Sequence, residues 1–584
     1  MVSPAPLSMF FKRKKRFFDR YKSHPITPEM FTQNRKPRIH LLSVAMASIS
    51  GIFLLVFFIY ISPMLDFIST VDVVESSSVV EQACKATRFS SVCKKTIASL
   101  PAKSSPQDVI LASIASSVSS LATARSIAKA ILDVSSDDIN RTNAAKNCID
   151  LLRYSKYRLD QASPAVSASK TDDAMAWTSA ALLFQYDCFS ALKYVNGTKQ
   201  VDDAMWFLIS LQDLTSNALS LMFSYRRFGG DFSKWSPPLT ERDGYYWSGS
   251  GSSAPVGGGV SFPPDLKKNY NAMVCRNRRE IGCFKTVQEA VDSAPEFSGK
   301  RFVIYIPAGV YKEIVRVPLE KTNLVFIGDG MGKTVITGSL NHKIAGVTTY
   351  NTATVAANGD GFMAKDLTFE NNAGPNGQQA VAFRSDSDFS VFVDVEFLGY
   401  QDTLYAHSLR QYYKSCRIAG TVDYIFGNSA SVFEDCQLLI RTRLKSPEKG
   451  ESNPVTAHGR TDPAQSTGFV FRNCTVDGTP DYLAVYKKKP AKHRNYLGRP
   501  WKEYSRTVFL ECHLAEIVTV EGWKPWSGDF ALSTLFYGEY RNSGPGANAA
   551  KRVSWSNQIP ADQISSFSLQ NFIQGDTWIP SSNV

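Results

Sequence analysis

The chain has 584 residues, of which 43% are hydrophobic and 20% charged, so it is no disordered chain and is too long for one core. Its formal net charge of +12 is uneven, because residues 1–40 carry ten Lys/Arg against two Asp/Glu. The rest of the chain carries only +4, and this mild charge gives no indication of a nucleic-acid partner.

Leu41–Ile61 is an uncharged apolar run that follows this basic tail. Its 21 residues are enough to span a bilayer as a helix, and they start too far into the chain for a typical cleaved signal peptide. The basic flank predicts a cytosolic N-terminus and a single-pass type II membrane protein of the secretory pathway. The alternatives are a signal anchor that is cleaved late and, less favoured by the flank, a buried core helix.

Cysteines and glycosylation triplets support export of the rest of the chain. All ten cysteines follow the apolar run, and cysteines in an exported region favour disulfides. Three N-x-S/T triplets are candidate glycosylation sites: Asn140, Asn196 and Asn473.

Residues 74–228 have the texture of a helical bundle, with long stretches of Ala, Ser and Leu at helical spacing and short polar connections. Cys84 and Cys93 can staple a helical hairpin, and Cys148 and Cys188 can join two bundle helices. Several carboxylates are interpreted as helix starts, which favour acidic residues: Asp172, Asp173, Asp202 and Asp203.

The segments CKATRFSSVC and DDAMAWTSAALLFQYDC resemble the plant invertase and pectin methylesterase inhibitor family. The resemblance implies an all-α four-helix bundle with two disulfides at this spacing, and a capacity to inhibit. Residues 229–268, rich in Gly, Ser and Pro, then predict a linker. Related proproteins carry a dibasic-Leu-Leu processing motif here, whereas this chain has LTERDGYYW with a lone Arg242, which puts cleavage in question.

From Phe284 onward the chain consists of short β-branched and aromatic runs separated by turns. One strand motif, in which a small polar or acidic residue stands between apolar ones, recurs along this half of the chain. Its polar positions, spaced by 28, 21, 20, 38 and 38 in turn, are Asp366, Asp394, Ser415, Asp435, Asn473 and Glu511. Such recurrence without intervening helices predicts an all-β, right-handed parallel β-helix over residues 270–584 rather than a sandwich.

Asp402 and Asp423 are 21 residues apart, and Cys416 and Cys436 are 20 apart, which is about one coil. Neighbouring coils lie about 4.8 Å apart, so the cysteines are predicted to be bridged or stacked, and the two carboxylates to face each other. Repulsion between such carboxylates raises one pKa, which suits acyl transfer or glycoside cleavage. The alternative is that both aspartates only end strands and bind turn amides.

Other candidate side chains belong to the same face. Gln401 precedes Asp402 and can donate to an oxyanion, and Gln379 lies one coil earlier. Arg499 offers a cation for a substrate carboxylate, and Trp501 offers a flat surface for a sugar ring. Each also has a structural interpretation: a turn residue, an ion pair or a core aromatic.

Five segments resemble, in order, the regions that mark plant pectin methylesterases: GVYKE, QAVAFR, GYQDTLYAHSLRQYY, GTVDYIFGN and LGRPW. The resemblance implies ester hydrolysis of methyl-esterified pectin without metal or cofactor, in the cell wall or extracellular space. By position it implies Asp423 as nucleophile, Asp402 as general acid and then base, and Gln401 as transition-state stabiliser. It implies substrate contacts at Thr349, Gln379, Arg499 and Trp501, and a disulfide at Cys416–Cys436.

The chain departs from the family pattern only at non-catalytic positions. Phe383, Tyr424 and His458 replace the usual Leu, Phe and Gln, and CRNRREIGC offers a further bridge between Cys275 and Cys283. Polygalacturonase and pectate lyase are the competing interpretations for this fold and substrate. From another class, the chain can be a membrane-held inhibitor whose esterase half is silent. The inhibitor-like domain is itself a candidate partner of the catalytic half.

Overall fold

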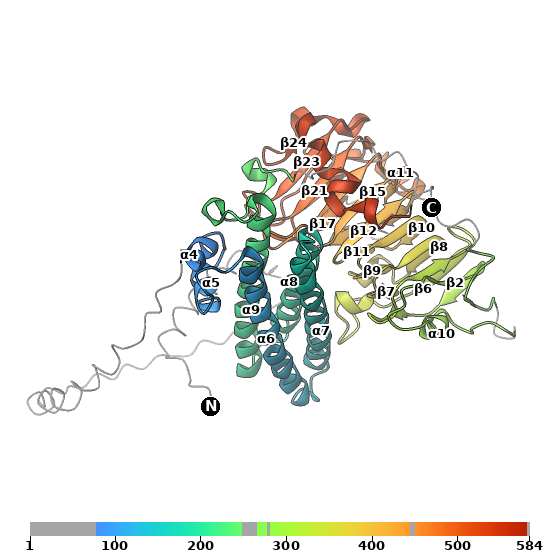
Figure 1. The fold of residues 1–584 in the computed structure, drawn as a ribbon. Helices are drawn as coiled ribbons and strands as arrows, with labels where there is room; N and C mark the ends of the chain where they lie inside the picture. The colour runs from blue at the N-terminus through green and yellow to red at the C-terminus, as the bar shows by residue number, and fades with distance from the viewer. Residues whose placement is uncertain (1–77, 248–265, 277–280, 444–449, 581–584) are drawn as a thin grey trace, which may run out of the picture. The chain divides into compact units, whose positions relative to one another are not determined.

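The computed structural model describes residues 78–247, 266–276, 281–443 and 450–580. The basic tail 1–40, the apolar run Leu41–Ile61 and residues 248–265 of the predicted linker lie outside these ranges. The chain from Ser78 onward belongs to one compact unit, with helices first and parallel β-strands after them (Figure 1).

Residues 78–228 form the helical part. Its helices are α4 (Ser78–Cys84), α5 (Ser90–Thr96), α6 (Pro106–Asp133), α7 (Ile139–Ser167), α8 (Thr171–Lys193) and α9 (Lys199–Phe228). Helices α6 to α9 pack side by side as a bundle, which confirms the predicted all-α domain (Figure 1). Among the described residues α6 is long and apolar enough to cross a membrane, but it packs against α7 and α9.

Polar side chains start three of the bundle helices. Ser105 and Asp108 form a reciprocal capping box at the start of α6, Asp138 accepts two backbone amides at the start of α7, and Thr198 caps α9. The connections between these helices are short, so consecutive helices are antiparallel neighbours.

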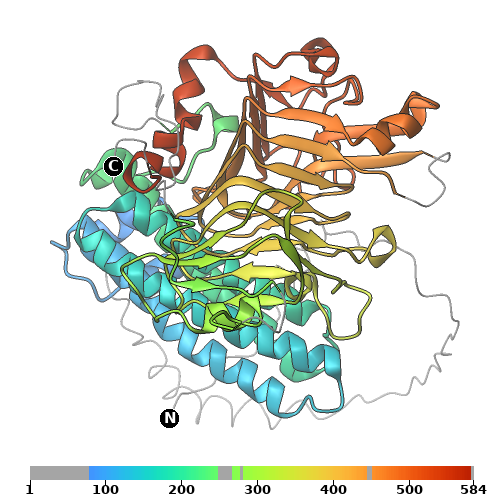
Figure 2. The same cartoon turned by 90° about the vertical axis from the view of Figure 1, so that its right-hand side faces the viewer.

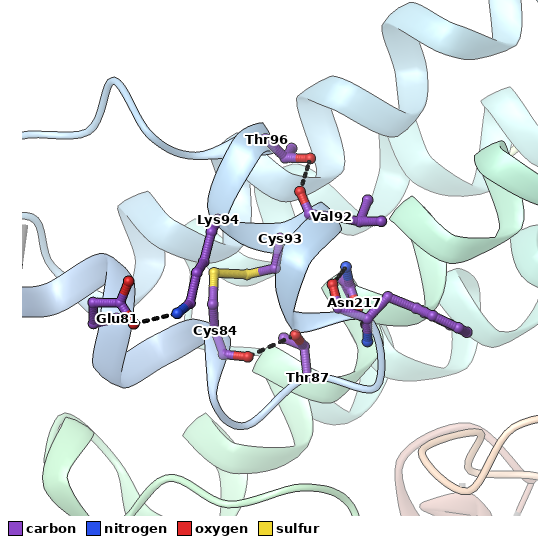
Figure 3. The surroundings of a disulfide bond; sticks show 9 residues. Glu81, Cys84, Thr87, Val92, Cys93, Lys94, Thr96 and Asn217 are labelled. Carbon is purple, nitrogen blue, oxygen red and sulfur yellow. Dashed lines mark hydrogen bonds and ion pairs between the residues drawn. A yellow bond between two sulfur atoms is a disulfide. The ribbon is translucent and has the colours of Figure 1, made fainter. Parts of the chain in front are cut away.

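Disulfides hold the helical part at two places. Cys84–Cys93 joins α4 to α5, where Thr87 Oγ1 also donates to the Cys84 carbonyl and Lys94 pairs with Glu81 (Figure 3). Cys148–Cys188 joins α7 to α8. Both pairings agree with the sequence-based expectation, and Cys275–Cys283 closes a third, local loop.

The β-part is a solenoid of parallel strands (Figure 2). In the described residues its larger, 17-stranded sheet contains β1 (Ala272–Met273), β2 (Phe302–Tyr305), β3 (Gly309–Lys312), β5 (Leu324–Ile327), β6 (Thr334–Gly338), β8 (Met363–Asn371), β10 (Ser390–Leu398), β12 (Arg410–Lys414), β13 (Arg417–Gly420), β15 (Ala430–Glu434), β16 (Gln437–Ile440), β18 (Gly468–Arg472), β19 (Thr475–Gly478), β21 (Arg506–Leu510), β22 (His513–Leu514), β23 (Phe536–Tyr540) and β24 (Asn557–Gln558). The short helices α10 (Val287–Asp292), α11 (Pro480–Tyr486) and α12 (Leu569–Ile573) accompany it.

A 7-stranded sheet runs beside it and carries the site described below. Its strands are β4 (Val315–Val317), β7 (Val355–Ala357), β9 (Phe383–Ser385), β11 (Leu404–Ala406), β14 (Ile425–Gly427), β17 (Glu451–His458) and β20 (His493–Gly498).

The recurring strand motif marks the corner of each coil. In parallel register, Val391 pairs with Tyr412, Tyr412 with Val432, Val432 with Val470 and Val470 with Val508, which reproduces the spacing of the motif along the sequence. The polar residue of every motif has a left-handed backbone, with φ between 51° and 58°. Asn and Asp tolerate this conformation best among L-residues, and one such residue turns the chain between two strands.

The coil interior is a stack of aromatic rings. Phe392, Tyr413, Phe433, Phe471 and Phe509 stack face to face with centroids 4.5–4.6 Å apart. These rings come from the same strand position of successive coils, so they keep each coil in register with the next.

Cysteines form a second stack, so the stacking that the coil spacing allowed is confirmed, and the Cys416–Cys436 disulfide that the family resemblance implied is wrong. Cys416, Cys436, Cys474 and Cys512 are one coil apart and buried, but they are free thiols, so Cys416–Cys436 is stacked and not bridged. In-register parallel strands bring the Cα atoms within disulfide range but direct both side chains into the core. There each sulfur lies 3.3–3.5 Å from two main-chain carbonyl oxygens, either of which can accept the single S–H hydrogen.

Candidate active site

Asp402 and Asp423 lie on successive coils of the 7-stranded sheet. Strands β11 and β14 are paired in parallel with Leu404 opposite Ile425, and each aspartate precedes its strand by two residues. Both side chains are almost buried, at 7% and 6% exposed, and both residues have left-handed backbones, with φ of 64° and 50°. The corner that lets the chain enter each short strand therefore also presents the carboxylate.

The two carboxylates have different electrostatic environments. Arg499, directly after β20, donates from Nε and a terminal nitrogen to the two oxygens of Asp423, at 2.8 and 2.5 Å. Such a bidentate pair fixes the orientation of the Asp423 carboxylate in the cavity wall. Burial, reinforced by the charge of Asp423, raises the pKa of Asp402 well above its usual value, although Arg499 acts in the opposite sense. Arg499 thus binds one carboxylate directly, while burial raises the pKa of the other.

All seven side chains that the sequence singles out line one cavity of about 850 Å³: Thr349, Gln379, Gln401, Asp402, Asp423, Arg499 and Trp501. The carboxamide oxygen of Gln379 is buried without a hydrogen-bond partner among the described residues, so this side chain has unused capacity next to the carboxylates. The cavity therefore offers a nucleophile, an acid, amide groups and a cation to one bound substrate.

Aromatic side chains that the sequence analysis did not select complete the cavity wall. Tyr405 and Phe426 stack at 4.0 Å, Trp501 packs edge-on against Phe426, and Trp526 lies 4.1 Å from the Arg499 guanidinium. Tyr405 and Phe426 are separated by the same interval as the two aspartates, so the same coil argument identifies them. Trp526 has no comparable sequence signal.

The helical part forms the opposite wall of this cavity. Asn147 and Leu151 of α7, Asp187 of α8 and Tyr194 at the end of α8 line it together with the residues above. Nε2 of the buried His407 lies 2.7 Å from Asp187, while its Nδ1 contacts Asp386. His407 therefore contacts both the β-part, through Asp386, and the helical part, through Asp187.

An asparagine row on α7 holds the loop that carries Thr349. The Gly346 amide donates to Asn140 at 2.9 Å, and the Asn143 amide donates to the Gly346 carbonyl at 2.9 Å. Asn147 and Asn351 exchange two amide hydrogen bonds, at 2.6 and 3.1 Å. Carboxamides can both donate and accept, so two members of the row bind the backbone of Gly346 and the third binds the side chain of Asn351.

Ion pairs and hydrogen bonds fasten the helical part to the β-part elsewhere. Arg158 of α7 binds Asp360 through both terminal nitrogens, at 2.7 and 2.6 Å. Arg410 donates to Asp173 at the start of α8 as well as to Asp388, which also accepts from Trp177. Asp173 is thus a helix-start acid, as predicted, that also takes part in docking.

No group of three or more His, Cys, Asp or Glu side chains within residues 78–247, 266–276, 281–443 and 450–580 is arranged to hold a metal ion. The site chemistry described here is that of carboxylates, amides and a guanidinium.

Two family models match the chain. Residues 271–576 match the pectinesterase model, and residues 78–221 match the plant invertase/pectin methylesterase inhibitor model. This chain belongs to the pectinesterase family. Its β-helix is the pectinesterase domain, and its helical part is an inhibitor-like domain.

Individual relatives agree with this assignment. The chain is 52% identical over 508 residues to the probable pectinesterase/pectinesterase inhibitor 64 of Arabidopsis thaliana, covering 85% of this chain and 84% of that protein. It is 40% identical to pectinesterase 2 of Citrus sinensis, covering 76% and 81%. Among solved structures, the pectin methylesterase from carrot is 46% identical with a TM-score of 0.50, covering 53% of this chain and 95% of that one.

Proposed function

We propose that this pectinesterase hydrolyses the C6 methyl esters of galacturonate in homogalacturonan, releasing methanol and pectate and so modifying the cell wall. One observation carries the proposal. Asp423 accepts two hydrogen bonds from Arg499 and lies beside Asp402, whose pKa is raised by burial. This pairing of an anion with a proton donor is what covalent ester hydrolysis needs.

In the first half-reaction, an oxygen of Asp423 attacks the ester carbonyl carbon and the carbonyl oxygen becomes an oxyanion. The Gln401 side-chain amide donates to that oxyanion, with Gln379 on the same wall. The bond to the methoxy oxygen then breaks, Asp402 gives its proton to that oxygen, and methanol leaves. The product is an anhydride between Asp423 and the galacturonate carboxyl group.

In the second half-reaction, Asp402 is a carboxylate and takes a proton from water. The resulting hydroxide attacks the anhydride carbonyl, and the bond to Asp423 breaks. The enzyme returns to an ionised Asp423 and a protonated Asp402, and the galacturonate leaves as a carboxylic acid that gives its proton to the solvent. Thr349 and Trp501, on the cavity wall, are proposed to hold neighbouring sugar rings.

The test is methanol release from methyl-esterified pectin by wild-type protein and Asp423→Asn. Asparagine is the chosen replacement because it accepts the left-handed backbone of residue 423, where alanine would add strain. We expect a loss of at least about 1,000-fold in kcat while the variant keeps the wild-type circular dichroism spectrum. Wild-type activity in this variant would show that Asp423 is not the nucleophile. Shortened uronide chains, or unsaturated ends, would instead indicate a galacturonase or a lyase.

We further propose that the uncut chain is latent. The support is that α7 and α8 line the same cavity as the carboxylates and that α7 binds the loop of Thr349. A pectin strand that reaches Asp423 therefore has to displace part of the helical domain. This domain is the proposed partner that keeps the esterase inactive until it is released.

Leu41–Ile61 is proposed to anchor the chain as a type II membrane protein of the secretory pathway, with the catalytic domain reaching the cell wall or extracellular space. Three exposed asparagines are the proposed glycosylation sites: Asn140, Asn196 and Asn473. The mass of the protein recovered from the cell wall tests anchor and glycans together.

A further inference from the structure

Two arginines of the β-helix are buried close together beyond the active site. Arg460 follows β17 and Arg506 begins β21, and each is about 1% exposed. Burial, together with the charge of Arg506, lowers the pKa of Arg460 to about 9. A pair of buried like charges requires a counter-ion.

Main-chain carbonyls satisfy part of this pair but bring no negative charge. Arg460 donates to the carbonyl oxygens of Asp462 and Pro463, and Arg506 donates to that of Gln465. The Asp462 carboxylate is engaged elsewhere, by Arg88 and Ser216 of the helical part. The Asp462 carboxylate therefore acts on Arg460 only through its charge and forms an ion pair with neither arginine, so the two guanidinium groups need a further acid.

That acid is Glu241, which does not belong to the β-helix. Its Oε1 accepts from Arg506 at 2.9 Å and its Oε2 lies 3.9 Å from Arg460, with the glutamate side chain 1% exposed. In the part of the chain that the structure describes, no other carboxylate forms an ion pair with either arginine. Glu241 thus occupies a site formed by the β-helix.

Glu241 comes from the connector, residues 229–247, which follows α9. A short 3-10 turn, Glu241–Asp243, presents it, and the turn is fixed because the backbone and hydroxyl of Thr240 both donate to Asp243. Gly244, with φ of 75°, ends the turn. The sequence analysis assigned these residues to a linker, yet Glu241 is only 5% exposed.

Aromatic residues after the turn bind both parts of the molecule alternately. Tyr245 and Trp247 pack edge-on against Phe223 of α9, with centroids 5.3 and 5.6 Å apart. Tyr246, between them, packs against Phe536 of β23 and against the ring of Phe567, also on the β-side. An extended segment directs successive side chains to opposite sides, which explains the alternation.

We propose that Arg460 and Arg506 form a buried carboxylate-binding site of the β-helix whose ligand is Glu241. Through this site the connector keeps the helical domain bound to the esterase even after the chain is cut beyond Trp247. Cleavage within residues 248–265 would then yield a two-chain protein. Release of the inhibitor-like domain would require a second event that removes Glu241 from the arginines.

The experiment uses the full chain with a protease recognition site inserted after Gly257 and an affinity tag at the N-terminus. After cutting, the immobilised N-terminal fragment is washed and the loss of the β-helix fragment is followed with time. We expect retention of the wild-type pair for hours and at least a tenfold faster loss for Glu241→Gln. Asp231→Asn, which removes an exposed carboxylate from the same connector, should change the rate less than twofold.

Separation of the wild-type fragments at once, or equal rates for Glu241→Gln and Asp231→Asn, would overturn the proposal. A second measurement needs no variant. Formate should speed the release of the cut wild-type pair at concentrations where chloride at equal ionic strength has little effect, because only formate replaces the glutamate carboxylate. Equal effects of the two anions would show charge screening and would also overturn the assignment. Neither readout depends on esterase activity.

Discussion

At the scale of single residues, the environment of Asp402 determines its chemistry. Asp402 is buried in the cavity wall, next to Asp423, whose carboxylate is paired with Arg499. Burial and the Asp423 charge both favour the neutral form of Asp402, so its proton is retained into a pH range where an exposed aspartate has lost it. The proton that we propose to serve methanol departure therefore also influences stability.

Asp402→Asn should change the pH dependence of stability. Between the usual pKa of an aspartic acid, about 3.9, and the raised pKa of folded Asp402, the folded protein holds a proton that the unfolded chain releases. The free energy of unfolding of the wild type therefore falls as pH rises through this window. Asparagine does not titrate, so the variant should gain in relative unfolding temperature as pH rises from about 4.

Thermal unfolding at several pH values measures this difference, and parallel curves for variant and wild type would contradict the raised pKa. In the same variant kcat should fall by about 100- to 10,000-fold, because the general acid and base is removed. Stability and activity thus move in opposite directions, which a merely structural aspartate would not produce.

At the scale of elements, the coil interior rests on two stacks, one of aromatic rings and one of thiols. Each stacked cysteine is a small buried side chain whose S–H has a carbonyl acceptor, so the stack requires no covalent bond.

Counting thiols tests this arrangement. All ten cysteines lie in described residues, with six in disulfides and four free. A chromogenic disulfide reagent should find almost no reactive thiol in the native protein and four after unfolding without reductant. Two thiols, with one bridge located by mass spectrometry at Cys416–Cys436, would restore the rejected pairing.

Sequence reasoning succeeds here where a period exists. The recurring strand motif identifies the coil, and the coil brings Asp402 next to Asp423 and Gln379 into the same cavity. It fails on the cysteines, because a period predicts proximity but not the direction of two side chains or their oxidation state. The sequence motif showed a polar residue at each corner, but it did not predict the left-handed backbone of that residue.

The residues that join the helical part to the β-part do not recur at a fixed interval in the sequence. Asp173 and Asp187 carry no sequence signal that distinguishes them from other acids of the bundle, because their partners, Arg410 and His407, belong to the distant other half of the chain. Glu241 was passed over for the same reason, in a segment whose Gly/Ser/Pro surroundings indicate a flexible linker. Docking depends on surface shape, which only the folded structure provides.

At the scale of the whole molecule, charge complementarity joins an inhibitor-like domain to the esterase that it accompanies. Arg158, Asp173 and Asp187 each place a charged group against an opposite or hydrogen-bonding group of the β-helix. Like charges at such contacts cost several kcal/mol, so reversing two of them should weaken docking.

Asp173→Lys combined with Asp187→Lys should raise methanol release by the full chain at least tenfold, because one lysine then faces the like charge of Arg410 and the other removes the carboxylate that contacts His407. The matched control is Asp160→Lys with Asp203→Lys, which makes the same charge change at exposed acids whose ion pairs stay within their own helices. Initial rates on soluble pectin measure the effect. Equal activity of the two double variants would contradict latency.

The stacked rings of the coil interior have a consequence for the site outside them. Asp402 and Asp423 belong to different turns of the solenoid. Their separation is therefore set by the distance between one turn and the next. That height is maintained by neighbouring rings such as Tyr413 and Phe433, whose centroids are 4.5 Å apart. The spacing of the two carboxylates is therefore set by buried side chains of the solenoid interior, which do not line the active-site cavity.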